Sequence, residues 1–231
     1  MAALTIRGLL LIALAVALTF ANALHDRFHF DDDHSLVTNS HIRQWAEIPN
    51  FFSDPQLFSR NQGSEMYRPL VLFSYAITYR FYGYQAPVYH LFNIGVHLLV
   101  VFAVYGLYLR LGLRGVTALG GAILFGIHPL VGEPVNYVSS RSESLASLFF
   151  LAGLLCYTSD RGWALALALA CYVGALMSKS SAIVLPAVLL AYEGLMRGPS
   201  LRWRRLVLFG VLALGYLWAS RRLLQEAVGA T

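Results

Sequence analysis

The sequence predicts an all-α membrane protein, a polytopic bundle of about six to seven transmembrane helices whose large first outer loop carries interfacial helices. Two observations support this fold class. The chain is 58% hydrophobic and only 13% charged, with a mean hydropathy of +0.60, whereas soluble domains contain about 25% charged residues. Apolar runs also recur along most of the chain, and several approach the length of about 20 residues that a helix needs to cross a bilayer.

The apolar runs define the elements in order. We expect spanning helices at roughly residues 6–24, 88–109, 115–130, 142–158, 162–177 and 181–197, with a seventh at roughly 205–220. An alternative for the first run is a cleaved signal peptide, because Arg7 precedes it and small residues follow at 21–23. Residues 1–231 then form a single membrane domain, in which 25–87 is the first extracytoplasmic loop.

Basic residues in short loops predict the orientation, because cytoplasmic loops of membrane proteins are enriched in lysine and arginine. With a cytoplasmic N-terminus, most arginines lie on the inner side, and the short outer loops hold Arg141 and Lys179. The inner residues are Arg7, Arg110, Arg114, Arg161, Arg197, Arg202, Arg204 and Arg205. Arg221 and Arg222 conflict with this orientation if the last helix crosses fully, and the alternative is that it ends at the interface. The net charge of +5 then reflects orientation and anionic membrane lipid, so we expect no nucleic-acid partner.

The loop at 25–87 is too long for a plain connection, which predicts a functional role. It contains a candidate short helix at 41–52, with Ser40 as the candidate cap and with apolar residues on one side, as in a helix that lies in the membrane interface. A second apolar helix follows residues 67–70 and runs to about Tyr82. We keep this helix on the outer side, because a full crossing would reverse the distribution of basic residues.

The acidic segment Phe28-His-Phe-Asp31-Asp32-Asp33-His34 directly follows the first spanning run. Carboxylates beside hydrocarbon are costly, which makes such a group a candidate functional site. We interpret Asp31 and Asp32 as functional in preference to simple helix caps, and Asp33 as a solvated loop residue. A divalent ion held by Asp31, Asp32 and a donor phosphate is one option, because hard cations prefer oxygen ligands.

Other polar residues are predicted at the same membrane face, although they come from distant parts of the chain. Each has a structural alternative. The structural alternative for His128, which precedes Pro129, is a helix terminator. The structural alternative for Glu133 and Arg141 is an ion pair between them. Lys179 either anchors the chain at the interface or binds a phosphate as a point charge. A further set shares one helix face and is interpreted as interhelical hydrogen-bonding residues: His90, Asn93 and His97.

Five motifs follow one another over residues 28–193. They read Phe28-x-Phe-Asp31-Asp32-x-x-x-Leu36-Val-Thr-Asn39; Tyr67-Arg68-Pro69-Leu70; Tyr89-His90-Leu-x-Asn93-x-x-x-His97; His128-Pro129-x-x-x-Glu133-x-Val135 with Arg141-x-Glu143-x-Leu145-Ala146; and Ser178-Lys179-Ser180 leading into Leu185-Pro186. In this order they resemble the transmembrane O-mannosyltransferases that carry TPR repeats, and their bacterial relatives. That family belongs to the GT-C class of polytopic glycosyltransferases.

The resemblance implies a GT-C-like fold and the transfer of a sugar, with mannose as one candidate, from a polyprenyl-phosphate donor. The acceptor is then a protein, through a hydroxyl group, or a glycan on the extracytoplasmic side. The resemblance assigns catalysis to Asp31 and Asp32, and a carboxylate there can take the acceptor proton as general base. Charge and membrane side suggest further residues that bind the donor phosphate or the substrate: Arg68, His128, Glu133, Arg141 and Lys179.

Full-length members of that family continue into more helices and a TPR domain, and we expect neither within residues 1–231. The alternatives to an active enzyme are a non-catalytic protein that binds the lipid-linked sugar or assists assembly, and an inactive fragment. A split protein would need a partner chain that supplies the missing C-terminal part. A transporter is disfavoured, because the polar residues gather at one face. All basic residues except Lys179 are arginines, which favours a bacterial inner membrane, while a eukaryotic chain is expected in the ER membrane.

Overall fold

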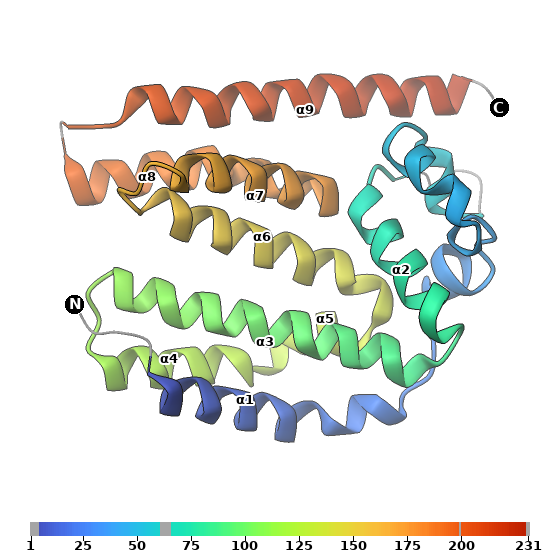
Figure 1. Ribbon diagram of the computed structural model, residues 1–231, viewed down its shortest axis with the longest axis horizontal. Helices are drawn as coiled ribbons and strands as arrows, with labels where there is room; N and C mark the ends of the chain where they lie inside the picture. The colour runs from blue at the N-terminus through green and yellow to red at the C-terminus, as the bar shows by residue number, and fades with distance from the viewer. Residues whose placement is uncertain (1–4, 61–65, 199, 230–231) are drawn as a thin grey trace.

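Helices make up the regular structure of the described residues, 5–60, 66–198 and 200–229, and the computed structural model contains no strand among them. The helices of the bundle lie side by side (Figure 1). They are α1 (Ile6–Phe20), α3 (Ala86–Arg110), α4 (Gly115–Gly126), α6 (Arg141–Tyr157), α7 (Ala164–Ser178), α8 (Leu185–Arg197) and α9 (Trp203–Gly229). Each coincides with one of the predicted apolar runs, so the all-α fold class is confirmed.

The length of these helices separates full spans from shorter ones. Among the described residues, three helices are long and apolar enough to cross a membrane, namely Ile6–His25, Ala86–Arg110 and Trp203–Ala227. A fourth span results if Gly115–Gly126 and Pro129–Asn136, which are bent by 60°, count as one. α7 rises only about 23 Å over its residues, against about 30 Å of hydrocarbon. The helices thus confirm an integral membrane protein, while fewer of them than predicted satisfy the length of a full span.

The two ends of the bundle differ in what they carry. The loop after α1, residues 26–60, lies beside α2 (Pro69–Tyr82) at one end, which we call the loop end (Figure 1). α1 leads into this end, and α3 leads away from it. The C-terminal part of α9 returns to the loop end, opposite the end at which α1 begins. α2 lies outside the row of bundle helices (Figure 1), and its place on the outer side of the membrane stays a prediction.

The loop contains 3₁₀ helices where the sequence predicted one helix at 41–52. These are η3 (His41–Arg43) and η4 (Trp45–Phe52). Pro49 lies inside η4, and proline lacks the backbone N–H that the interior of an α-helix requires. The predicted cap, Ser40, makes no side-chain capping hydrogen bond. The short-helix prediction was therefore right in place, but the structure divides the segment into two 3₁₀ helices.

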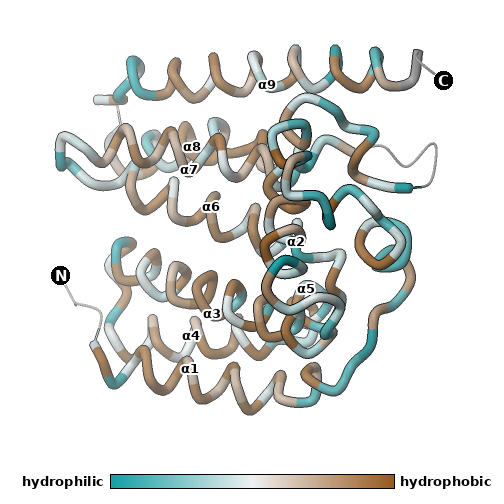
Figure 2. Tube along the Cα trace, turned by 45° about the vertical axis from the view of Figure 1, so that its right-hand side comes forward, coloured by the Kyte–Doolittle hydropathy of each residue, from teal (hydrophilic) through white to brown (hydrophobic). Residues whose placement is uncertain are grey.

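Three groups of buried apolar residues hold these elements together. One group joins α2 and α3 to the loop. A second group joins the four helices α6, α7, α8 and α9, and a third joins α1, α3 and α4. Phe51 and Tyr75 are buried in the first group, whereas Trp45 is 54% exposed, so the predicted apolar side of the loop helix is split between core and surface. Hydrophobic residues dominate the helices, and hydrophilic residues gather in the loop and near the helix ends (Figure 2).

Polar side chains on α3 make hydrogen bonds inside this apolar bundle. The Nε2 atom of His97 lies 2.8 Å from the carbonyl oxygen of Gly126 in α4. The Nδ2 group of Asn93 donates to the carbonyl of Pro134 at 3.3 Å, and His90 lies 3.5 Å from the carbonyl of Val135. The interpretation of these three residues as interhelical hydrogen-bonding residues is confirmed.

Candidate functional site

The carboxylate of Asp32 fastens the acidic segment, residues 28–34, to a distant part of the chain. Its Oδ1 atom accepts hydrogen bonds from the backbone N–H of Ser139 at 2.7 Å and from the Ser139 hydroxyl at 2.6 Å. Its Oδ2 atom accepts from the backbone N–H of His29 at 2.9 Å. The side chain is completely buried, and hydrogen bonds to an ionised acceptor are stronger than neutral ones. Asp32 therefore anchors the segment after α1 to η7 (Val138–Ser140) before α6.

The neighbouring carboxylate of Asp31 faces outward. Its side chain is 68% exposed, and its Oδ1 atom lies 3.5 Å from Nε2 of His34. The backbone of Asp31 is nevertheless held firmly, because its N–H donates to the Tyr137 hydroxyl at 2.8 Å and its carbonyl accepts from the Ser35 hydroxyl at 2.6 Å. Burial raises the pKa of Tyr137 above its ordinary value, so the phenol stays neutral at pH 7. The result is an open carboxylate on a fixed backbone.

Phe30, directly before this carboxylate, has an unusual backbone conformation. Its φ angle is +45°, and no other described residue except glycine has a positive φ. Bulky side chains rarely adopt this region, and such strain is concentrated at functional sites. The ring is 89% exposed, with an edge-to-face contact to Tyr137 at 6.3 Å between centroids. Sequence reasoning missed Phe30, because a phenylalanine beside an acidic pair carries no signal of its backbone angle.

Arg68 lies at the start of α2, between the acidic segment and α6. Its Nη1 atom donates to the Ser142 hydroxyl at 3.2 Å, and its guanidinium lies 5.6 Å from the centre of the Phe58 ring. Burial lowers the pKa of Arg68, while the negative charges of Glu143 and Asp31 act in the opposite direction. Arg68 is thus a partly buried cation within electrostatic reach of both carboxylates.

Lys179 and Glu143 form an ion pair that joins the end of α7 to the start of α6. Both side chains line a groove of about 460 Å³, which we call the lateral groove. The remaining wall is largely apolar and comes from α3, α4, α6 and η8 (Ser180–Val184), with Val104, Phe125 and Phe150 among its residues. The lateral groove therefore combines a long apolar wall with one charged pair.

Arg141 does not line this groove. Its guanidinium is completely buried and donates to Asn93 Oδ1 at 2.8 Å, to the Ser74 and Thr78 hydroxyls at 3.2 and 3.4 Å, and to the Tyr89 carbonyl at 3.2 Å. Its Cζ atom also lies 4.2 to 5.4 Å from the centres of three aromatic rings. Those rings are Tyr75, Tyr89 and Phe92. The alternative of an ion pair with Glu133 is wrong, because the guanidinium donates to these other groups.

His128 and Glu133 hydrogen-bond within the connection that joins α4 to α6. The Nδ1 atom of His128 accepts from the N–H of Leu130 at 3.2 Å, which caps η6 (Pro129–Val131). The Ser140 hydroxyl donates to Glu133 Oε1 at 3.4 Å. α4 ends at Gly126, short of the predicted residue 130. The interpretation of the His-Pro pair as a helix terminator therefore agrees with the structure.

A divalent metal fits the acidic pair poorly. Both oxygens of Asp32 already accept hydrogen bonds, which leaves Asp31 as the open carboxylate. Within the described part of the chain, no group of three or more histidine, cysteine, aspartate or glutamate side chains is arranged to hold a metal ion. The chemistry of the site therefore depends on its carboxylates and cations.

No family model matches the chain, and no solved structure matches it. Similar curated proteins do exist. Protein O-mannosyl-transferase TMTC3 of Mus musculus is 30% identical over 165 residues, which make up 70% of this chain and 18% of that protein. Protein O-mannosyl-transferase tmtc2 of Xenopus laevis is 33% identical over 156 residues, 64% of this chain and 18% of that protein. A protein O-mannosyl-transferase of Caenorhabditis elegans is 27% identical over 166 residues, 68% of this chain and 24% of that protein.

The chain thus spans about a fifth of the length of the relatives that it matches. The matched part makes up about two thirds of this chain, and the motifs that carry the resemblance extend from residue 28 to residue 193. The resemblance drawn from these motifs is confirmed: this integral membrane chain is similar, over about two thirds of its residues, to the protein O-mannosyl-transferases.

Proposed function

We propose that this chain is a membrane glycosyltransferase that moves a sugar, mannose, from a polyprenyl-phosphate donor to a hydroxyl group of an acceptor protein. The observation that carries the proposal is the division between two adjacent carboxylates. Asp31 is open and Asp32 is buried and fully hydrogen-bonded. The names of the similar proteins, protein O-mannosyl-transferases, support the reaction class.

Asp31 acts as the general base in this proposal. A base must reach the proton that it removes, and an exposed carboxylate can approach an acceptor hydroxyl. Asp32 positions this base, because its bonds to Ser139 and His29 hold the turn on which Asp31 lies. The two aspartates predicted as a catalytic pair therefore receive different roles.

The lateral groove is the proposed donor site. An isoprenoid chain is apolar and suits the wall formed by α3, α4 and α6, while the donor phosphate exchanges for Glu143 at Lys179. A cation next to the leaving phosphate stabilises the charge that develops there. Arg68, which bonds to Ser142 in the first turn of α6, supplies a second positive charge nearby. Arg141 is left out of the donor site, because its donors are used inside the core.

The role of His128 and Glu133 in substrate binding stays a prediction. In the structure, both side chains form hydrogen bonds within the connection before α6. We place the loop end outside the cytoplasm, in line with the distribution of arginines in the sequence. The bacterial inner membrane stays a prediction from arginine usage. For a eukaryotic chain, the ER membrane stays the prediction.

The test is sugar transfer in membranes that contain this chain, with radiolabelled polyprenyl-phosphate mannose as donor. Asp31→Asn should lower transfer by about 10² to 10⁴, the usual contribution of a general base. Asp33→Asn is the matched control, because Asp33 is an exposed carboxylate on the same segment, and it should keep near-normal transfer. Equal transfer by the Asp31→Asn variant and the wild type would refute the assignment of the base.

A second measurement separates an enzyme from a binding protein. A photoactivatable polyprenyl phosphate should label the lateral groove, and Lys179→Met should reduce this labelling while leaving the helix content unchanged. Labelling without any transfer by the wild-type chain would favour the alternative of a non-catalytic protein that binds the lipid-linked sugar. Absence of both would contradict the donor site itself.

A further inference from the structure

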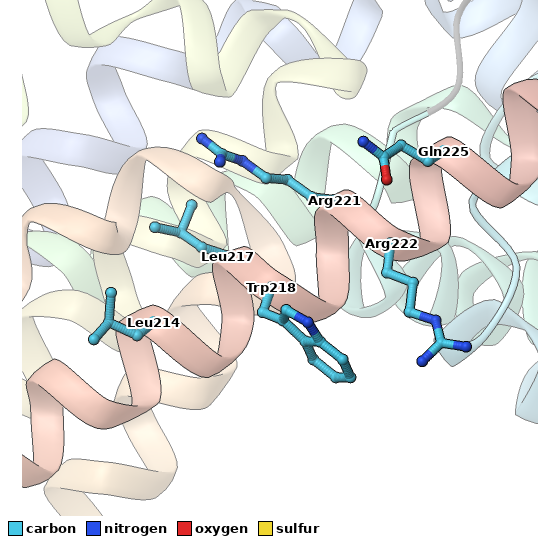
Figure 3. A pocket seen from close by; sticks show the side chains of 6 residues that line it. All are labelled: Leu214, Leu217, Trp218, Arg221, Arg222 and Gln225. Carbon is cyan, nitrogen blue, oxygen red and sulfur yellow. The ribbon is translucent and has the colours of Figure 1, made fainter.

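A second pocket lies away from the lateral groove, on the C-terminal half of α9. It measures about 580 Å³ and is lined by Leu214, Leu217, Trp218, Arg221, Arg222 and Gln225 (Figure 3). Leu214, Leu217 and Arg221 project to one side of the helix, and Trp218 and Arg222 project to the other (Figure 3). The first side also carries Gln225 (Figure 3), and residues 214, 217, 221 and 225 follow one another at spacings of three and four residues, which places them on one helix face. The pocket therefore changes from apolar to basic along the helix axis.

The position of this change matches the edge of a membrane. Residues 206–220 of α9 contain no charged side chain, and they rise only about 23 Å against a hydrocarbon thickness of about 30 Å. Trp203–Ala227 is long and apolar enough to span. The basic pair at 221–222 thus lies where hydrocarbon meets the lipid headgroups, and Trp218, which is 67% exposed, lies at the level where tryptophan is enriched.

The two arginines of this pair have different surroundings. Arg222 donates to Glu226 Oε1 at 2.8 Å, and its Cζ atom lies 5.7 Å from the centre of the Trp218 ring. Arg221 makes no hydrogen bond or ion pair with any residue that the structure describes. Helical side chains tilt toward the N-terminus of the helix, and the guanidinium of Arg221 extends back toward Leu217 (Figure 3). This direction leads toward the hydrocarbon, where an unpaired charge is costly.

We propose that this pocket binds an anionic phospholipid from the leaflet at the loop end. The lipid phosphate accepts hydrogen bonds from the guanidinium of Arg221, an arrangement that suits the planar fork of arginine. An acyl chain packs on Leu214 and Leu217, and the amide of Gln225 faces the headgroup. Charge complementarity selects this occupant, because an apolar helix from a second copy of the chain would leave Arg221 without an anion.

Trp218, which lines the pocket, can serve as a fluorescent probe of lipid binding. A chain with Trp45→Phe, Trp163→Phe and Trp203→Phe keeps Trp218 as its one tryptophan. This chain is reconstituted in phosphatidylcholine vesicles, and dibrominated phosphatidylglycerol or dibrominated phosphatidylcholine is added as a quencher. Phosphatidylglycerol should associate about fivefold more strongly, the ratio that corresponds to about 1 kcal/mol for one basic residue at a membrane surface.

Two variants separate a built site from general surface charge. Arg221→Gln should reduce the preference for phosphatidylglycerol to nearly one, and Arg222→Gln, which removes the same charge from an already paired side chain, should keep most of it. Equal losses in the two variants would overturn the proposal, as would equal quenching by both lipids in the wild-type background. Absence of quenching by either lipid would show that protein covers the pocket. If the Arg221→Gln variant does not insert into vesicles, the ratio of quenching by the two lipids in the chain with Arg221 still tests the proposal.

Discussion

Asp31 and Asp32 are chemically equivalent neighbours, and the fold gives them opposite surroundings. The difference arises from Ser139, which lies 107 residues further along the chain and donates two hydrogen bonds to Asp32. The sequence alone could place both carboxylates beside the membrane, because they directly follow an apolar run. It could not separate them, since nothing local to residues 28–34 reveals which side chain Ser139 meets.

This separation predicts that substitutions of the two aspartates change the free energy of unfolding by different amounts. Asp32→Ala leaves the partly buried N–H of Ser139 without an acceptor, and the loss of such a partner costs about 1–3 kcal/mol. Asp31→Ala changes an exposed side chain and should alter the free energy of unfolding by less than about 0.5 kcal/mol. Denaturant unfolding of both purified variants in detergent measures this. A larger loss of stability in Asp31→Ala than in Asp32→Ala would contradict the positioning role of Asp32.

Phe30 provides a second prediction at the scale of one residue. Its positive φ strains any side chain with a Cβ atom, by about 1–2 kcal/mol, whereas glycine adopts this region freely. Phe30→Gly should therefore be about 1 kcal/mol more stable than Phe30→Ala, although both variants lack the ring. Thermal unfolding compares the two. If the exposed ring contacts the acceptor, both variants also lose transfer to the same extent, and a difference in transfer would point to backbone geometry instead.

At the scale of elements, the apolar runs located every bundle helix and also α2, because their hydrophobic residues recur over whole helical turns. Side-chain partners were harder to predict. Arg141 looked like an outer cation from its place beside polar residues, but it is enclosed by α2, α3 and its own helix α6. Aromatic residues of α2 and α3 form this enclosure, and their distance in sequence hides it. Arg141 thus connects three elements, two residues after Ser139, which binds Asp32.

Arg141→Lys tests this connection. Lysine keeps the charge but lacks the planar fork that donates in several directions at once, so Asn93, Ser74 or the Tyr89 carbonyl loses its donor. We expect the free energy of unfolding to fall by about 2 kcal/mol or more. Arg43→Lys is the control, because the guanidinium of Arg43 also lies near a tyrosine ring, 5.3 Å from the centre of Tyr84, but at the surface. Equal effects of the two substitutions would contradict the structural role of Arg141.

At the scale of the whole molecule, the arrangement of the helices makes a prediction about topology. Successive bundle helices run in opposite directions, so the acidic segment and the end of α9 both lie at the loop end, whereas the turn between α6 and α7 lies at the other end (Figure 1). Only some of these helices are long enough to span on their own, and the short ones depend on their neighbours for burial of their ends. Topology therefore has to be measured as a property of the assembled bundle.

Single cysteines placed at both ends of the bundle test this arrangement directly. In a background with Cys156→Ala and Cys171→Ala, we expect Asp33→Cys and Gln225→Cys to react with a membrane-impermeant maleimide from the same side of sealed vesicles. Gly162→Cys should react from the opposite side only, and a Cβ atom at Gly162 meets no other atom within 4 Å. Reaction of all three positions from one side would contradict the alternating crossing of the bundle helices, and with it the position of the α9 pocket at the edge of a membrane. Opposite sides for Asp33→Cys and Gln225→Cys would show that α9 returns at the interface, as the conflict of Arg221 and Arg222 with the distribution of basic residues first suggested.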